Sequence, residues 1–289
     1  MQTIYRNASP RTTRPESAFR TRRWDLVAYA AAVLMAPVTL ASPAGAQTPV
    51  GMVEQPCLPP LPPASPVQTE AEIAARREAM AERRRLDWGG LCRHRAANAA
   101  LEGHAVDAVF LGDSITEFWE AASSDLFQGS VVNRGIGAQT SPQLLLRFQQ
   151  DVIGLHPRVV HLMIGTNDVA GNTGPSRPED FKNNVRSMVE LAQAHGIAVV
   201  IGAIPPVAVF SWRPELKPAA RIAELNAWLE DYARTRGAVF VDYHAAMRGP
   251  DGEMRSEFTS DGVHPDAEGY AVMTPMALAA LATAKASAD

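Results

Sequence analysis

From Val106 to Ser114 the chain reads Val-Asp-Ala-Val-Phe-Leu-Gly-Asp-Ser, an apolar run that ends in a Gly-Asp-Ser turn. Consecutive apolar positions over residues 106–111 are typical of a strand buried on both faces of a parallel sheet. Four similar runs follow, at residues 130–133, 158–164, 198–204 and 238–242. Amphipathic stretches typical of helices cover residues 143–153, 178–195, 217–236 and 265–285. The alternation predicts a three-layer α/β/α sandwich around a five-stranded parallel sheet.

Polar motifs follow the carboxyl ends of three of these predicted strands. Ser114 comes just after the first run, Asn133-Arg134-Gly135-Ile136-Gly137 closes the second, and Gly165-Thr166-Asn167-Asp168 follows the third. A fourth motif, Asp261-Gly262-Val263-His264-Pro265, precedes the last predicted helix. Ligand crevices in open parallel sheets lie beyond the carboxyl ends of the strands, so we expect all four motifs at one rim.

The residue types at this rim suit nucleophilic catalysis. The hydroxyl of Ser114 is a weak nucleophile near neutral pH and needs a base to take its proton. His264 can accept and return that proton, because an imidazole titrates near the working pH. Asp261 can reach the far ring nitrogen through the turn at Gly262. Taken singly, Ser114 and His264 also fit helix caps and Asn167 fits a turn residue, so it is their joint order that favours catalysis.

With these motifs the chain resembles the SGNH branch of the GDSL esterase/lipase family, named for Ser, Gly, Asn and His, over residues 106–273. The resemblance implies a flavodoxin-like sandwich in which Ser114 is the nucleophile, His264 the base and Asp261 its partner. It also implies an oxyanion hole made by the backbone amides of Ser114 and Gly135 and the side-chain amide of Asn167. Such donors stabilise the negative charge that develops on the attacked carbonyl oxygen.

Other polar residues near these motifs are interpreted as structural. Asp113 and Asp168 lie beside catalytic positions and are expected to support the loops by hydrogen bonding. His161 lies inside a predicted strand and is expected to be a core residue. His195 lies in the last turn of a predicted helix, where a cation interacts favourably with the helix dipole.

The substrate is less clearly encoded. Trp119 and Trp212 are candidate substrate-binding residues that can form an aromatic wall, although Trp119 also fits simple packing of a helix on the core. The stretches at 207–212, 225–226 and 241–243 resemble the branch similar to platelet-activating-factor acetylhydrolase catalytic subunits, which implies removal of short acyl groups. We therefore expect a serine esterase acting on short-chain esters, with acetylated carbohydrate or cell-envelope material as candidate substrates. The alternatives are a lysophospholipase or thioesterase for longer chains, and a non-catalytic module that binds envelope glycans. Acyl transfer to another acceptor stays open.

The N-terminal region is typical of an exported protein. Residues 1–46 have basic positions up to Arg23, an uncharged stretch over 26–41, and Ala44-Gly45-Ala46 as a cleavage site, which predicts a signal peptide removed after Ala46 and a periplasmic or secreted protein. A membrane anchor is the alternative, but the apolar stretch is short and Pro37 interrupts it. Residues 47–69 form a proline-rich linker, and residues 70–289 the hydrolase domain, which begins with a charged helix over 70–86.

Composition and cysteine content limit the remaining possibilities. With 46% hydrophobic residues the chain can bury one full domain core, and its net charge of −4 offers no basic surface for nucleic acid. No motif for a metal or a cofactor is present, and stable membrane insertion is not expected after signal removal. In an oxidising compartment Cys57 and Cys92 can form a disulfide, which we favour over two buried thiols. A homo-oligomer is possible, although no pairing surface is evident.

Overall fold

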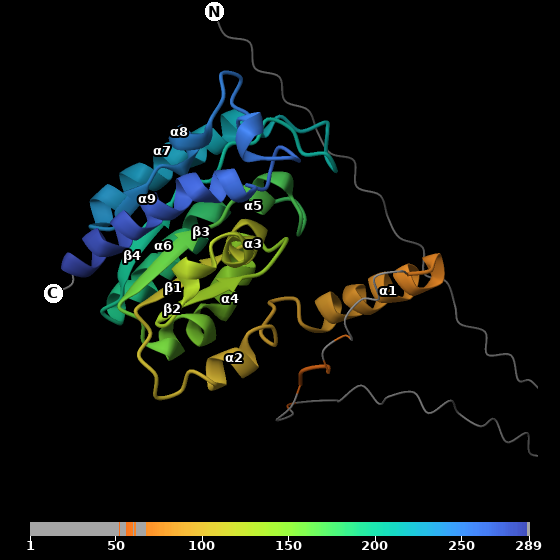
Figure 1. Cartoon of the computed structure of the whole chain (residues 1–289), viewed down its shortest axis with the longest axis horizontal. Coiled ribbons are helices and arrows are strands. Elements are labelled where there is room, and N and C mark those ends of the chain that lie inside the picture. The colour runs from red at the N-terminus through yellow and green to blue at the C-terminus, as the bar shows by residue number, and fades with distance from the viewer. Residues whose placement is uncertain (1–51, 53–55, 60, 62–67, 288–289) are drawn as a thin grey trace, which may run out of the picture. The chain divides into compact units, whose positions relative to one another are not determined.

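The computed structural model describes residues 52, 56–59, 61 and 68–287. The predicted signal peptide, its cleavage site and most of the linker over 47–69 lie outside the described residues. The centre of the fold is a parallel sheet with the strand order β2-β1-β3-β4-β5 (Figure 1). Its strands are β1 (Ala108–Gly112), β2 (Val131–Gly135), β3 (Val159–Met163), β4 (Ala198–Gly202) and β5 (Val239–Val241). The predicted five-stranded parallel sheet is confirmed.

Helices cover both faces of the sheet. Alternate side chains of β1 belong to different core clusters, since Val109 and Leu111 lie in one and Ala108 and Phe110 in the other. The first cluster includes side chains of α4 (Ser141–Asp151), α6 (Pro178–Ala194) and α7 (Pro218–Arg236). The second includes side chains of α3 (Ser114–Ala122) and α9 (Ala267–Ala286). The predicted three-layer α/β/α sandwich is therefore confirmed.

Helix boundaries follow local capping. The helix predicted from residue 143 begins at Ser141, because Thr140 and Gln143 form a capping box. The helix predicted from residue 265 begins at Ala267, because the Asp266 side chain caps it by accepting from the Gly269 amide. The shorter helices are α2 (Arg95–Ala99), α5 (Thr166–Ala170), α8 (Tyr243–Met247), η1 (Ser124–Phe127), η2 (Ile153–Leu155) and η3 (Ser256–Phe258).

The N-terminal part of the described chain is joined to the domain by a covalent bond. Cys57 and Cys92 form a disulfide with their Cα atoms 5.5 Å apart, which confirms the favoured pairing. The charged helix α1 (Glu70–Leu86) has the predicted bounds and contains no buried residue. Arg83 in its last turn donates to the carbonyl oxygens of Leu58 and Pro59. This helix therefore takes no part in the hydrophobic core.

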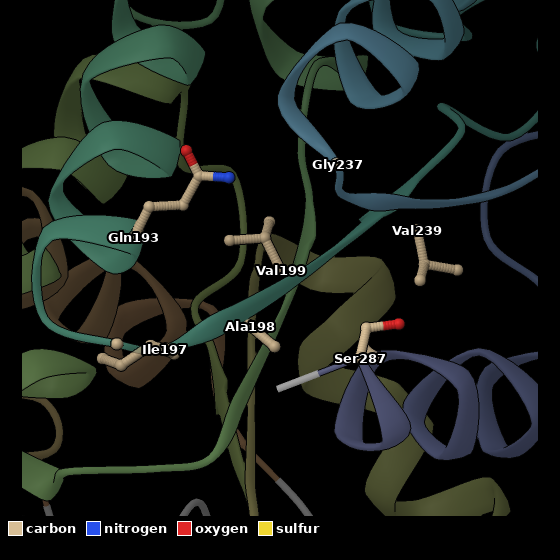
Figure 2. A pocket seen from close by; sticks show the side chains of 9 residues that line it. Gln193, Ile197, Ala198, Val199, Gly237, Val239 and Ser287 are labelled. Carbon is tan, nitrogen blue, oxygen red and sulfur yellow. The ribbon is translucent and has the colours of Figure 1, made fainter. Parts of the chain in front are cut away.

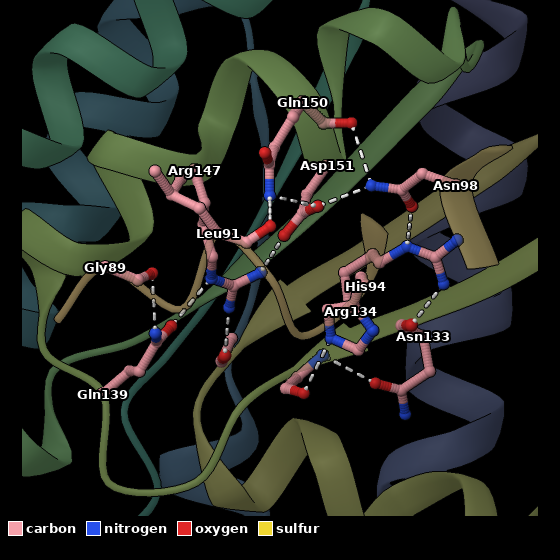
Figure 3. A network of polar contacts seen from close by, with 12 residues as sticks. Gly89, Leu91, His94, Asn98, Asn133, Arg134, Gln139, Arg147, Gln150 and Asp151 are labelled. Carbon is pink, nitrogen blue, oxygen red and sulfur yellow. Dashed lines mark hydrogen bonds and ion pairs between the residues drawn. The ribbon is translucent and has the colours of Figure 1, made fainter. Parts of the chain in front are cut away.

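A buried ion pair within α4 belongs to a polar network that reaches the carboxyl end of β1 (Figure 3). The side chains of Arg147 and Asp151 are fully buried, and Nη1 lies 2.9 Å from Oδ2. Arg147 Nη2 donates to the Gly112 carbonyl at 3.0 Å, and Nε donates to Gln139 Oε1 at 2.7 Å. Asp151 Oδ1 also accepts from Asn98 Nδ2 at 2.7 Å. The network thus holds the end of β1 at Gly112, the first residue of the Gly-Asp-Ser turn.

Candidate active site

Ser114 is placed by the junction between β1 and α3. A Cβ at Gly112 would lie 2.6 Å from the Met163 carbonyl oxygen, so the end of β1 can approach β3 this closely only with glycine at position 112. Asp113 caps α3 by accepting from the Ile115 amide at 3.0 Å. Ser114 is the first residue of the helix, and its own amide therefore has no partner within the helix. The unpaired amide and the positive end of the α3 dipole both favour a negative charge beside Ser114.

His264 and Asp261 meet the nucleophile from the loop before α9. Ser114 Oγ lies 3.0 Å from His264 Nε2, and His264 Nδ1 lies 2.7 Å from Asp261 Oδ2. The predicted turn at Gly262 has a φ of 78°, in the left-handed region that favours glycine. Burial alone would raise the pKa of Asp261. The hydrogen bonds from His264 and Val263 together outweigh burial and lower the pKa to about 2. Asp261 is therefore an anion beside the imidazole at neutral pH.

Thr259 supports this loop and was not singled out by sequence reasoning. Its Oγ1 donates to the His264 carbonyl at 2.7 Å and accepts from the Gly262 amide at 3.0 Å. The hydroxyl thus bridges the two sides of the turn that carries His264. A threonine close before an Asp-Gly turn is the available sequence signal, but it is a common one.

Asn167 reaches the same rim from the first turn of α5. Its side chain is buried, and Nδ2 donates to Asp113 Oδ2 at 3.0 Å. One hydrogen of the amide group is engaged in this bond, which leaves the second available for a ligand. The predicted supporting role of Asp113 is confirmed by this bond. Burial raises the pKa of Asp113 to about 7, against the lowering effect of the bond from the Ile115 amide.

Asp168 also supports a loop as predicted. Its carboxylate accepts from the Ser141 hydroxyl at 2.6 Å and from the Ser141 amide at 3.0 Å. These bonds join α5 to the first turn of α4. Burial raises the pKa of Asp168 to about 6.

The predicted role of Gly135 as an oxyanion donor is wrong. Its amide donates to Asn133 Oδ1 at 2.7 Å and is therefore not free to bind an oxyanion. The reason for glycine at this position is packing, because a Cβ would lie 2.1 Å from the Glu117 amide nitrogen in α3. Gly135 lets β2 pass close to the first turn of α3.

Ala138 instead presents a free amide next to the nucleophile. A Cβ added at Gly137 would lie 3.7 Å from Ser114 Cβ, so the turn of residues 136–138 lies against Ser114. Within the part of the chain that the structure describes, the Ala138 amide has no hydrogen-bond partner, and the residue is exposed. Its φ of 64° is left-handed, a conformation that costs an L-residue roughly 1–2 kcal/mol. Sequence reasoning missed Ala138 because glycine and asparagine are the usual residues there.

The two tryptophans have different environments. Trp119 is fully buried, and its Nε1 donates to Thr274 Oγ1 at 3.0 Å. Its prediction as a substrate-binding residue is therefore wrong, and the alternative of core packing holds. Trp212 is 45% exposed, in the loop after β4. Phe118 is 47% exposed, and its ring centroid lies 5.4 Å from that of His264, which makes it an apolar rim residue that the sequence did not single out.

His161 and His195 lie where the sequence predicted. His161 is buried in β3, and its Nε2 lies 2.8 Å from the Tyr243 hydroxyl. Burial lowers its pKa to about 3, so it is neutral at physiological pH. His195 is the C-cap residue of α6. Neither ring lies at the rim.

Features elsewhere in the described structure do not define a competing site. A cavity of about 380 Å³ lies at the amino ends of β4 and β5 (Figure 2). Ser114 follows the carboxyl end of β1 and so lies at the opposite edge of the parallel sheet. Its lining includes Gln193, Ile197 and Val199 but no titratable side chain. Among the described residues no group of three or more metal-ligating side chains occurs. No helix in the described ranges is long and apolar enough to cross a membrane.

The fold is a three-layer sandwich, and a hydrogen-bonded serine, histidine and aspartate lie at the carboxyl edge of its sheet. This is the architecture of a GDSL-type acylhydrolase. Residues 110–272 match the family model described as "GDSL-like Lipase/Acylhydrolase family". The chain belongs to this family.

Two bacterial crystal structures are similar over most of the domain. A protein from Bacteroides fragilis, provisionally named an acylhydrolase, is 42% identical, with 69% of this chain and 99% of that chain covered and a TM-score of 0.66. A GDSL-like lipase from Bacteroides thetaiotaomicron is 40% identical, with 68% and 98% covered and a TM-score of 0.66. An uncharacterized lipoprotein of Bacillus subtilis is 36% identical over 80 residues, which are 27% of this chain and 33% of that protein. The chain thus matches about a third of that relative's length.

Proposed function

We propose that the protein is an exported serine esterase that hydrolyses short-chain esters. The observation that carries the proposal is the hydrogen-bonded path from Ser114 Oγ through His264 to Asp261, with distances of 3.0 and 2.7 Å. His264 takes the Ser114 proton as Oγ attacks the ester carbonyl, and Asp261 stabilises the imidazolium that forms. His264 then returns the proton to the leaving alcohol. A water molecule, activated by the same imidazole, releases the acid from the acyl-enzyme.

The oxyanion in this mechanism is bound by three donors. They are the backbone amides of Ser114 and Ala138 and the free hydrogen of the Asn167 side-chain amide. In this proposal each donates to the negative charge that forms as the carbonyl becomes tetrahedral, and such a donor typically accounts for about 10²–10³ in rate. In this proposal the backbone amide of Ala138 takes the oxyanion-binding role that the sequence assigned to the Gly135 amide.

A short acyl group and a bulky alcohol fit the rim best. Ser114 is partly exposed, and the side chains of Phe118, Val209 and Trp212 are exposed around the sheet edge. Exposed apolar and aromatic side chains of this kind suit the ring of a sugar as the leaving alcohol. Among the described residues the loops at 171–177 and 203–217 contain no helix that could form a lid over a long acyl chain.

Export is supported by two observations. The disulfide between Cys57 and Cys92 is of a kind that persists in oxidising compartments. The similar Bacillus subtilis protein is named a lipoprotein. With cleavage after Ala46, the protein would meet acetylated carbohydrate or cell-envelope material as substrate.

The test is hydrolysis of p-nitrophenyl esters from acetate to palmitate, with Ser114→Ala assayed in parallel. We expect the highest kcat/KM at acetate or butyrate and a loss of roughly 10⁴-fold or more in kcat for Ser114→Ala. Ser124→Ala, an exposed serine in η1, is the matched control and should retain activity. A peak at long chains would instead support a lysophospholipase or thioesterase. Folded protein without activity on any ester would support the glycan-binding module.

A further inference from the structure

Asn172 connects two loops of the rim to the buried amide of Asn167. The Asn172 side chain lies just after α5 and donates from Nδ2 to Asn167 Oδ1 at 2.5 Å. Its Oδ1 accepts from Trp212 Nε1 at 3.2 Å. Asn167 Nδ2 in turn donates to Asp113 Oδ2 at 3.0 Å. A single line of hydrogen bonds therefore joins the segments that follow β4, β3 and β1.

We propose that Asn172, held by Trp212, is a positioning residue that fixes the side-chain amide of Asn167 for oxyanion binding. The inference rests on the proposed esterase function. Asn172 itself does not touch the reacting atoms in this scheme. It acts by selecting one of the two orientations that the Asn167 amide can adopt.

The ends of this hydrogen-bonded line set its direction. An indole N–H can only donate, so the atom of Asn172 that faces Trp212 must be its oxygen. The Asn172 NH₂ group then faces Asn167 and requires an oxygen there. At the other end Asp113 Oδ2 accepts from Asn167 Nδ2, and above its pKa of about 7 the ionised carboxylate of Asp113 can only accept, so it requires the NH₂ group of Asn167. Both ends therefore demand the same orientation of the Asn167 amide.

The orientation matters for the proposed chemistry. In the observed orientation the second hydrogen of Asn167 Nδ2 is available to the oxyanion. Rotation of the amide by 180° would exchange the nitrogen and the oxygen, and the Asn167 oxygen would repel the developing negative charge. The fixed dipole thus has to be aligned before the reaction, which is where preorganised donors gain their effect.

Local backbone geometry places Asn172 for this task. Helix α5 is only five residues long and ends at Ala170, and its C-cap residue Gly171 has a φ of 67°, which turns the chain back. The Asn172 amide then donates to the Asn167 carbonyl at 3.1 Å, which brings the two side chains together. Asn172 is exposed, so it contributes little to the core. Its substitution should therefore affect the site and not the folding of the domain.

Three substitutions separate the elements of the proposal. Asn172→Asp keeps the acceptor for Trp212 but offers Asn167 an acceptor in place of a donor, which favours the wrong orientation. Asn172→Ala removes the hydrogen bond to Asn167 Oδ1 without favouring either orientation of the Asn167 amide. Trp212→Phe keeps an aromatic ring at the rim but removes the N–H that orients Asn172. Asn183→Asp, an exposed position on α6, is the matched control for the asparagine-to-aspartate change.

The measurements are kcat and KM on the best p-nitrophenyl ester, with the thermal midpoint of each variant. We expect kcat to fall about tenfold or more for Asn172→Asp and about three- to tenfold for Asn172→Ala, since one hydrogen bond is typically worth about 1 kcal/mol. Trp212→Phe should lower kcat about two- to threefold. KM and the thermal midpoint should change little in all three, and Asn183→Asp should match the wild type.

Several outcomes would overturn the inference. Wild-type kcat in Asn172→Asp would do so, as would a rise in KM at unchanged kcat, which would indicate substrate binding alone. A fall of kcat that follows the thermal midpoint would indicate a merely structural role. Failure of the esterase proposal is recognised separately, because Ser114→Ala would then be as active as the wild type or the wild type inactive.

Discussion

At the scale of single residues, the buried carboxylate of Asp113 links stability to pH. Burial raises its pKa from 3.8 to about 7, although the hydrogen bond donated by the Ile115 amide opposes this rise. Between these values the folded protein binds a proton that the unfolded chain has released. The stabilisation that this proton brings is present at low pH and is lost as the pH rises through about 7. The site thus holds an acceptor for Asn167 at the expense of stability.

We predict that Asp113→Asn removes this dependence. Relative to the variant, the wild-type protein should lose about 2–3 kcal/mol of unfolding free energy between about pH 5 and pH 8, because it alone must ionise a buried acid. Urea denaturation at pH 5, 6, 7 and 8 measures the difference. Asp125→Asn, at an exposed carboxylate, should follow the wild type. Parallel curves for the wild type and Asp113→Asn would contradict the prediction.

The sequence predicted some site residues better than others for physical reasons. The contact between Asp261 and His264 is local, and a three-residue spacing across a Gly turn is enough to predict it. Gly135 was misinterpreted because a glycine required by a passing helix and a glycine required by a ligand look the same in sequence. Ala138 gave no signal, since its left-handed conformation is imposed by the turn and not by the residue. Trp119 was predicted wrongly as a substrate-binding residue, because an aromatic residue that closely follows the nucleophile fits a pocket wall and core packing equally well in sequence.

At the scale of elements, Glu117 connects α3 to the turn that follows β2. Its Oε2 accepts from the Gly137 amide at 2.7 Å, and its Oε1 accepts from Arg93 Nη2 at 2.7 Å. Gly137 immediately precedes Ala138. The carboxylate therefore determines how the helix of the nucleophile and the turn of the free amide lie relative to each other.

We predict that Glu117→Ala lowers kcat about tenfold with little change in KM, because the turn loses the bond that fixes the Ala138 amide. Glu117→Gln keeps an acceptor oxygen for Gly137 and should recover most of the activity. Arg93→Ala should have a smaller effect, since an exposed ion pair contributes about 1 kcal/mol or less. Glu120→Ala, an exposed position on the same helix, is the control. Equal losses in the Ala and Gln variants would contradict this role.

Helices were predicted well where an apolar pattern continues over many consecutive residues. The helices at 178–195 and 217–236 were predicted within one residue of α6 and α7, because a sustained apolar period precedes a glycine that can cap the helix. The short helices α5 and α8 were missed. A five-residue helix has too few turns to show a period and is stabilised by the surrounding structure.

At the scale of the whole molecule, the layer order was predictable but the buried ion pair was not. Alternating strands and helices allow few arrangements other than a parallel sheet between helical layers. Arg147 instead appears in sequence as an ordinary polar position of an amphipathic helix. Its partners include the Gly112 carbonyl, 35 residues away, and no local pattern indicates such a contact.

This network leads to a prediction about global stability. Arg147→Ala leaves the Asp151 carboxylate buried without its cation and should lower the unfolding free energy by about 3–5 kcal/mol. The double variant Arg147→Met with Asp151→Leu removes both charges and should recover part of that loss. Recovery should be incomplete, because Gln139 and the Gly112 carbonyl still lose a donor. Urea denaturation of the three proteins gives the comparison.

An exposed ion pair supplies the control for this experiment. Arg221 and Glu224 pair on the surface of α7 at 2.6 Å, with side chains 46% and 53% exposed. Water solvates both groups when either is removed, so Arg221→Ala should cost about 1 kcal/mol or less. If Arg147→Ala cost no more than Arg221→Ala, the buried network would be dispensable for stability. If the double variant were less stable than Arg147→Ala alone, the loss would come from packing and from the orphaned carbonyl, not from an uncompensated charge.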